Sequence, residues 1–171
     1  LEKPCTAGLA FKLIHGLLKH LREINVERAF EVDPKESLAL SALGTIADLV
    51  PLNMENRILA RFGLKHLGHN PSPGLRSLLE ESGLQSGILP ESEDITFKLA
   101  PRINACGRLD DPETASSLML EQDLKTCQLL AKKMNAYNDE RKEIDARLTE
   151  DALAQANECF STKSAVVVCG K

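Results

Sequence analysis

The chain has 171 residues, of which 43% are hydrophobic and 27% are charged, and its formal net charge is −4. This balance predicts a packed core in one ordinary domain, or in two small ones joined by a helix, and it excludes wholesale disorder. The negative charge argues against a protein that coats nucleic acid nonspecifically, because affinity for phosphate comes mainly from Lys and Arg. With no Trp, one Tyr and five Phe, an aromatic platform for stacking bases is poorly supported.

The number of cysteines and the hydropathy of the chain indicate the redox state of its thiols and its cellular location. The five cysteines are odd in number and never have C-x-x-C spacing, which favours reduced thiols over a disulfide framework or a zinc knuckle. No apolar run reaches the ~18–20 residues of a membrane span and no signal peptide opens the chain, so we expect a cytoplasmic protein without a membrane partner. The start on Leu1 and the strand-like end lead us to expect cuts at both termini.

Apolar residues spaced three and four apart predict the first two helices. The first covers residues 6–22, with Thr6 as its N-cap, and buries one stripe. The second runs from residue 35 to about residue 47, and Asp33-Pro34 supplies its cap and first position. Because nearly every face of this second helix is apolar, we expect it to be deeply buried.

A turn and a basic helix follow. The residue before Pro51 is pushed out of helical geometry, which leaves Asp48 at a buried helix end. The next helix, from residue 53 to about residue 67, carries three bases on one face, namely Arg57, Arg61 and Lys65. Bases without acids recur over residues 95–109, and two such islands in an acidic chain could form an anion-binding footprint. Short charge runs that merely face solvent are the equal alternative.

The middle of the chain is broken by Pro and Gly. We expect a short helix over residues 73–82 and a loop over residues 83–93. Because Pro101 interrupts the stretch 94–108 and Gly107 follows an apolar run, we expect a short helix there that leads into an irregular loop.

The last part is dominated by one long helix. A short helix over residues 113–120 precedes it, and Asp123 caps it. Over residues 124–158 the pattern predicts a helix of roughly 50 Å, which is longer than a small domain and suits a connector between lobes. Residues 164–169 predict a buried strand, which needs partner strands.

Two stretches could carry chemistry. In GTIADLVPL, residues 44–52, the carboxylate of Asp48 suits a hard divalent cation if other oxygens meet it, although a lone Asp more often satisfies loop amides. In LAPRINACGR, residues 99–108, two guanidiniums and an amide on a Pro/Gly-shaped loop suit phosphate recognition. Those three residues are Arg102, Asn104 and Arg108. Pairing of the arginines with nearby carboxylates is the equal alternative.

The order of several blocks is more specific than either stretch alone. After an opening CTAGLAFKL the chain reads GTIADLVPL, ENRILARFGL, PGLRSLLEESGL and KLAPRINACGRLDDPETA, and MNAYNDER stands in the long helix. Over essentially its whole length, this order resembles the middle of the RecJ-like single-stranded-DNA-specific exonucleases of the DHH phosphoesterase superfamily.

The resemblance implies 5′-to-3′ degradation of single-stranded DNA by two Mn²⁺ or Mg²⁺ ions, in DNA repair and recombination, with repair or helicase proteins as partners. It implies that Asp48 is a catalytic metal ligand from the last metal-binding motif. It also implies that the 102–108 loop grips the DNA backbone through Arg102, Asn104 and Arg108. The stripe of Arg57, Arg61 and Lys65 is expected to add nucleic-acid contacts.

The fold that the resemblance implies is mainly α. Residues 1–70 would be the C-terminal part of a DHH catalytic lobe, and residues 71–121 a helical junction with the DNA-contacting loop. Residues 122–160 would be the connector helix, and residues 161–171 the start of a DHHA1 lobe with its first β-strand.

The family's paired aspartates, its central aspartate, the DHH triplet and a glycine- and histidine-rich segment do not occur in this sequence. A two-metal mechanism needs both ions, so we expect the chain alone to be inactive and to bind no metal. Two other interpretations stay open, namely a DHH phosphodiesterase of short oligonucleotides or cyclic dinucleotides, and a non-enzymatic RecJ-like replication scaffold.

Overall fold

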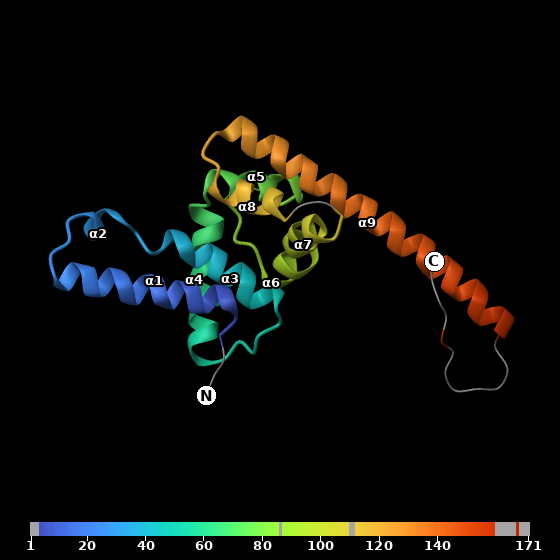
Figure 1. Ribbon diagram of the computed structural model, residues 1–171, viewed down its shortest axis with the longest axis horizontal. Coiled ribbons are helices and arrows are strands. Elements are labelled where there is room, and N and C mark those ends of the chain that lie inside the picture. The colour runs from blue at the N-terminus through green and yellow to red at the C-terminus, as the bar shows by residue number, and fades with distance from the viewer. Residues whose placement is uncertain (1–3, 86, 110–111, 160–166, 168–171) are drawn as a thin grey trace.

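The computed structural model describes residues 4–85, 87–109, 112–159 and 167. Within those residues the regular structure is helical and no strand occurs, which confirms the mainly α prediction (Figure 1). The strand predicted over residues 164–169 lies outside the described residues except for Val167, whose side chain is exposed. The helices are α1 Thr6–Glu23, α2 Arg28–Glu31, α3 Glu36–Ala47, α4 Met54–His69, α5 Pro73–Glu81, α6 Ser92–Asp94, the π-helix η1 Ile95–Leu99, α7 Ala100–Leu109, α8 Glu113–Leu120 and α9 Leu124–Cys159.

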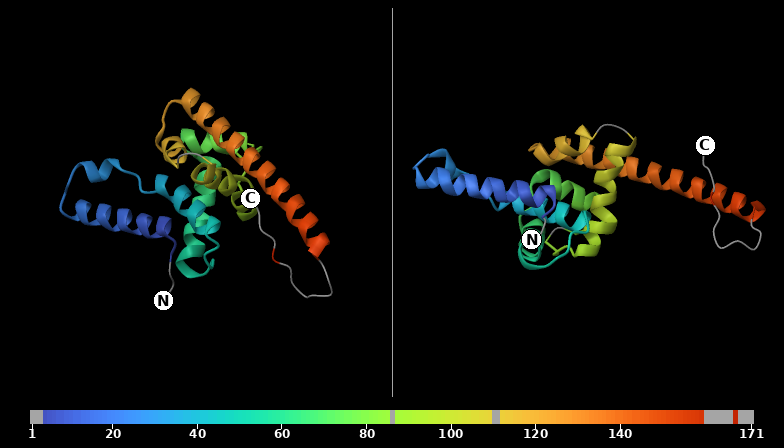
Figure 2. Two further views of the ribbon diagram at one scale, coloured as in Figure 1. Left: turned by 45° about the vertical axis from the view of Figure 1, so that its right-hand side comes forward. Right: turned by 60° about the horizontal axis from the view of Figure 1, so that its bottom comes forward.

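One hydrophobic core joins most of these helices. Its buried side chains come from α3, α4, α5, η1, α7, α8 and the first half of α9, with Leu67, Leu78, Leu99, Leu118 and Met134 completely buried. Helix α3 packs against α1 and α4, while α5, α7 and α8 pack against α9. In Figures 1 and 2, α1 and α2 extend from this body on one side and the second half of α9 extends from it on the other.

Helices α3 and α4 cross so closely that only glycine fits at the crossing. A Cβ on Gly63 would overlap the carbonyl oxygen of Leu38 and the Cβ of Ala42. This close approach buries α3, as its apolar sequence predicted, and thereby fixes the position of the helix end that carries Asp48.

The N-terminal end of the fold differs from the sequence prediction in three details. Cys5, not Thr6, caps α1, because its Sγ accepts the N–H of Gly8 at 3.3 Å. Helix α2 was not predicted. Helix α3 begins at Glu36, and Asp33 instead accepts the N–H of Lys35 at 3.0 Å.

The predicted irregular loop within residues 94–108 is wrong, since α6, η1 and α7 form one continuous helical segment. Pro101 lacks an N–H and its ring crowds the preceding turn, so a regular α-helix resists it. The wider π turn stands directly before it, with the N–H of Ala100 donating to the carbonyl of Ile95. Gly107 is helical as well, and its surroundings are open.

Helix α9 has two unlike halves. Cys127, Ala131, Met134 and Asn138 are buried along one stripe at spacings of three and four. Beyond Arg141 no described residue of α9 is buried. Asp123 caps the helix as predicted, accepting the Thr126 N–H at 2.9 Å. No helix of the described residues is long and apolar enough to cross a membrane.

Candidate nucleic-acid interface

A cleft of about 220 Å³ is lined by residues of η1, α7, the end of α3 and α9. Figure 1 shows α7 beside α9, against which it packs. Its described lining contains two guanidiniums and an amide and no acidic side chain. The lining residues are Ala47 from α3, Thr96 from η1, Ala100, Pro101, Asn104 and Arg108 from α7, and Arg141 from α9. A positively charged concave site of this kind attracts anions.

Asp48 follows Ala47 directly, at the C-cap of α3. The helix ends in a Schellman motif, in which Leu49 N–H donates to Ile46 O at 3.0 Å and Val50 N–H to Thr45 O at 3.2 Å. Leu49 takes the left-handed position, φ 53°, which usually belongs to glycine. The sequence predicted a buried helix end, but this turn exposes the Asp48 side chain.

The Asp48 carboxylate accepts no hydrogen bond from the residues that the structure describes. The alternative in which it satisfies loop amides therefore has no support in that part of the chain. An exposed carboxylate oxygen suits Mn²⁺ or Mg²⁺. The described residues contain no group of three or more His, Cys, Asp or Glu that could hold a metal ion, so Asp48 fits as one ligand and does not make a site by itself.

The Arg102 guanidinium donates two hydrogen bonds to oxygens within the protein. Its Nε donates to Asn135 Oδ1 on α9 at 2.9 Å, and its Nη1 donates to the Lys98 carbonyl at 2.7 Å. Arg102 also adds to the positive field that, after the hydrogen bond and charge of Lys142, lowers the pKa of Asp139. Arg102 is half-buried and does not line the cleft. It joins α7 to α9, which leaves Nη2 as its one nitrogen without a hydrogen bond to the described residues.

Asn104 and Arg108 come together as the sequence predicted, although on a helix face and not on a loop. Both side chains are exposed, and both line the cleft. Within the described residues, Arg108 forms no ion pair. Gly107, which precedes Arg108 in the chain, is exposed and has nothing within 4 Å of a Cβ at that position, so another molecule can approach its backbone.

Arg141 is a cleft residue that the sequence reasoning missed. Its Nη1 pairs with Asp145 Oδ2 at 2.5 Å and its Nη2 donates to Asn138 Oδ1 at 3.3 Å, while its Nε is buried and finds no hydrogen-bond partner among the described residues. Asn138, 1% exposed, continues the buried stripe of Met134. A polar pair that continues an apolar stripe at spacings of four and three is the signal that could have identified Arg141.

The basic stripe of Arg57, Arg61 and Lys65 is exposed on α4, as predicted. None of the three residues lines the cleft, so the structure does not join the two basic islands into one pocket. Next to the stripe, the apolar side chains of Ile58 and Phe62 are 56% and 51% exposed.

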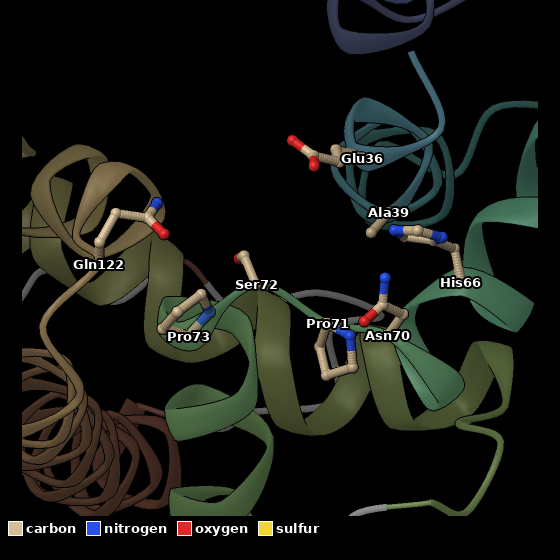
Figure 3. Close-up of a pocket in the computed structure, with 8 residues that line it drawn as sticks. All are labelled: Glu36, Ala39, His66, Asn70, Pro71, Ser72, Pro73 and Gln122. Carbon is tan, nitrogen blue, oxygen red and sulfur yellow. The ribbon is translucent and has the colours of Figure 1, made fainter. Parts of the chain in front are cut away.

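A second cleft, of about 230 Å³, lies between α3, α4, the start of α5 and the link from α8 to α9 (Figure 3). Figure 3 shows Glu36 pointing into the open space and His66 lying beside Ala39. Ser72 in this cleft is the N-cap of α5 and accepts the Leu75 N–H at 3.4 Å. The Glu36 carboxylate disfavours an anion, and Glu36 with His66 provides only two metal-ligand types, so this cleft offers less chemistry than the first.

No family model matches the chain. Comparison with individual proteins identifies exonuclease RecJ from several bacteria. The chain is 37% identical over 161 residues to the single-stranded-DNA-specific exonuclease RecJ of Bacillus subtilis, covering 94% of this chain and 19% of that protein. It is 42% identical over 150 residues to RecJ of Dickeya dadantii, covering 85% of this chain and 26% of the relative. The chain thus spans about a fifth to a quarter of the curated relatives that it matches.

Solved structures give the same result. A crystal structure of exonuclease RecJ bound to manganese superposes with a TM-score of 0.76 at 33% identity, over 91% of this chain and 37% of that one. RecJ of Thermus thermophilus in complex with Mg²⁺ superposes with a TM-score of 0.67 at 32% identity, over 77% of this chain and 21% of that one. In sequence and in fold, over most of its length, this chain is similar to a part of the single-stranded-DNA-specific exonuclease RecJ.

Proposed function

We propose that this chain is part of a metal-dependent single-stranded-DNA exonuclease of the DHH superfamily that degrades DNA in the 5′-to-3′ direction. The curated relatives are single-stranded-DNA-specific exonucleases, and the similar solved structures contain Mn²⁺ or Mg²⁺. The observation that carries the proposal is the cleft lined by Asn104 and Arg108 and by Ala47, the residue directly before the exposed Asp48, with no acidic side chain in its described lining.

Asp48 supplies one carboxylate to the catalytic metals in this proposal, and polypeptide beyond this stretch supplies the other ligands. Divalent ions, when bound, activate water and stabilise the charge on the leaving oxygen. The chain's own contribution is positional. The Schellman turn at Leu49 sets the carboxylate outward at the end of a deeply buried helix, so the backbone holds it in a fixed place.

Arg108 and Asn104 bind the DNA backbone. A guanidinium offers two parallel N–H donors that match two phosphate oxygens, and the Asn104 amide adds a third donor from the same helix face. Arg102 acts on this site chiefly by holding α7 against α9 through Asn135. The exposed bases of α4, Arg57, Arg61 and Lys65, form a separate outer track for the strand.

The wider architecture is part of the same proposal. Residues 1–70 belong to the catalytic lobe, residues 71–121 to the junction, residues 122–160 to the connector and residues 161–171 to a DHHA1 lobe. Support comes from α9, whose second half has no buried residue in the described part of the chain and extends from the body as a connector would (Figure 2). We place the protein in the cytoplasm, in DNA repair and recombination, where repair or helicase proteins are its partners.

Binding of single-stranded DNA tests the proposal. We expect the chain to bind a 5′-phosphorylated oligonucleotide weakly, with an affinity that falls steeply with salt. Loss of one phosphate contact in Arg108→Ala should reduce the slope of log affinity against log salt by about 0.7. The matched control is Arg147→Ala, an exposed arginine on the projecting half of α9. No binding by the wild type, or equal slopes for both variants, would contradict the proposal.

A further inference from the structure

The most exposed aromatic side chain of the described residues stands beside the phosphate-binding cleft. Phe97 is 73% exposed, whereas its neighbours Ile95 and Leu99 on the same π-helix are completely buried. The ring therefore points away from the core. Phe97 therefore leaves a large apolar ring in solvent, where a ligand can reach it.

Phe97 shares one helix face with the cleft residues. Within η1 and α7 the exposed positions are 97, 104, 107 and 108, and Pro101, which lines the cleft, lies between them. Thr96, the residue directly before Phe97, also lines the cleft. From Phe97 to Arg108 the helical rise is about 16 Å. The face thus offers an apolar ring at one end and a guanidinium at the other.

The charges around this face select the occupant. Residues 95–109 contain no acid. Lys98 is paired with Asp94 at 2.7 Å and Arg102 is bonded to Asn135, whereas Arg108 forms no ion pair with a residue that the structure describes. A ligand that fits needs an anion at one end and a flat apolar face at the other. Single-stranded DNA repeats that combination at every nucleotide.

We propose that Phe97 is a stacking platform for a nucleobase of the strand whose phosphate Arg108 and Asn104 hold. The inference rests on the proposed function and adds a contact to the base. A low overall count of aromatic residues does not oppose it, because one exposed ring is sufficient for one base. Stacking on an aromatic side chain is tolerant of sequence, which suits an enzyme that reads no particular base.

An abasic scan tests the platform in the 171-residue chain. The probes are a 5′-phosphorylated 12-nucleotide oligothymidylate and derivatives that lack the base at one position each. For the wild type we expect one or two adjacent positions at which loss of the base weakens binding by roughly tenfold. Phe97→Leu keeps an apolar side chain without an aromatic face and should abolish that difference. Phe30→Leu, at an exposed phenylalanine on α2, should preserve it.

The two proposals fail in different ways. If Phe97→Leu weakens binding equally for intact and abasic probes, or if the wild type is indifferent to every abasic position, the platform is overturned, while sensitivity to Arg108→Ala keeps the proposed function. If the wild type binds no probe, the proposed function itself fails. If Phe97→Leu lowers the thermal stability of the chain but leaves its affinity for DNA unchanged, Phe97 packs against protein and the platform is overturned.

A fluorescence measurement tests the contact directly. The chain has no Trp, so Phe97→Trp introduces a single reporter at the proposed platform. Stacking of a base should quench its emission when saturating oligonucleotide is added, and Phe30→Trp should stay unquenched. Emission from position 97 that does not change while binding is confirmed by anisotropy would overturn the platform.

Discussion

Arg102 on α7 and Asn135 on α9 are joined by a hydrogen bond of 2.9 Å between Nε and Oδ1, across 33 residues of sequence. Sequence reasoning assigned Arg102 to the DNA, whereas the structure uses two of its nitrogens inside the protein. This bond sets the position of α7, and hence of Asn104 and Arg108, relative to the helix that carries Arg141.

The first prediction separates the two roles of Arg102. Asn135→Ala removes the acceptor and leaves the guanidinium in place, so the free energy of unfolding should fall by about 1–2 kcal/mol. Urea titration measures this, with the exposed Lys132→Ala on the same helix as control. If Arg102 acted only on DNA, Asn135→Ala would cost no more than the loss of the exposed 3.0 Å bond from Asn135 Nδ2 to Asp139.

The second prediction concerns hydrolysis. Asp48 is a single carboxylate, and a mechanism with two divalent ions needs several oxygen ligands for each. We therefore expect the 171-residue chain to leave 5′-phosphorylated single-stranded DNA intact in the presence of Mn²⁺. Release of nucleotides, followed by gel electrophoresis, would show that the chain assembles a metal site without further polypeptide.

Helix boundaries were predicted well where the spacing of apolar residues alone determines them. The spacing of apolar residues predicted α4, α5, α8 and α9 to within about two residues at each end. The apolar stripe that indicates each helix in the sequence is the stripe that packs into the core. Pro101 misled the prediction for residues 94–108, since a π turn lets the helix continue past a residue that usually ends one.

The candidate site was only partly accessible to the sequence. Asn104 and Arg108 were found because they are close together in the chain, and Arg141 was missed because the docking of α7 on α9 brings it to them. The exposure of Asp48 also gave no signal. A Schellman turn is recognised by glycine at its left-handed position, and here that residue is Leu49.

The third prediction uses that turn. A non-glycine residue at positive φ costs roughly 1–2 kcal/mol. Leu49→Gly should therefore stabilise the protein by up to about 1 kcal/mol, once roughly 0.4–1 kcal/mol is subtracted for the added freedom of the unfolded chain. Leu49 is 77% exposed, so little packing is lost. Thermal unfolding measures the gain. A clear loss of stability would show that the leucine side chain has a contact that outweighs the strain.

The fourth prediction compares two helical glycines. Gly63→Ala places a methyl group into the Leu38 carbonyl and Ala42, so α3 and α4 must separate at a cost of about 1–3 kcal/mol. Gly16 on α1 has nothing within 4 Å of a Cβ, so Gly16→Ala should stabilise by about 0.5–1 kcal/mol through helix propensity. Opposite signs in denaturant unfolding are expected, and equal signs would contradict the close crossing.

The fifth prediction concerns acid unfolding. Hydrogen bonds from the Thr126 backbone and hydroxyl to the Asp123 cap lower the pKa of that carboxyl, and bonds from Lys98 and the Glu91 backbone lower the pKa of Asp94. A carboxyl with a depressed folded pKa stabilises the protein above its unfolded pKa, and this contribution is lost as pH falls through the folded value.

Asp123→Asn keeps a capping oxygen but does not titrate. Its stability should therefore decline less steeply than that of the wild type below the ordinary pKa of Asp, about 4. Thermal unfolding at a series of acidic pH values measures the slope, with Asp151→Asn on the exposed half of α9 as control. Equal slopes in wild type and Asp123→Asn would show that the cap bonds are absent in solution.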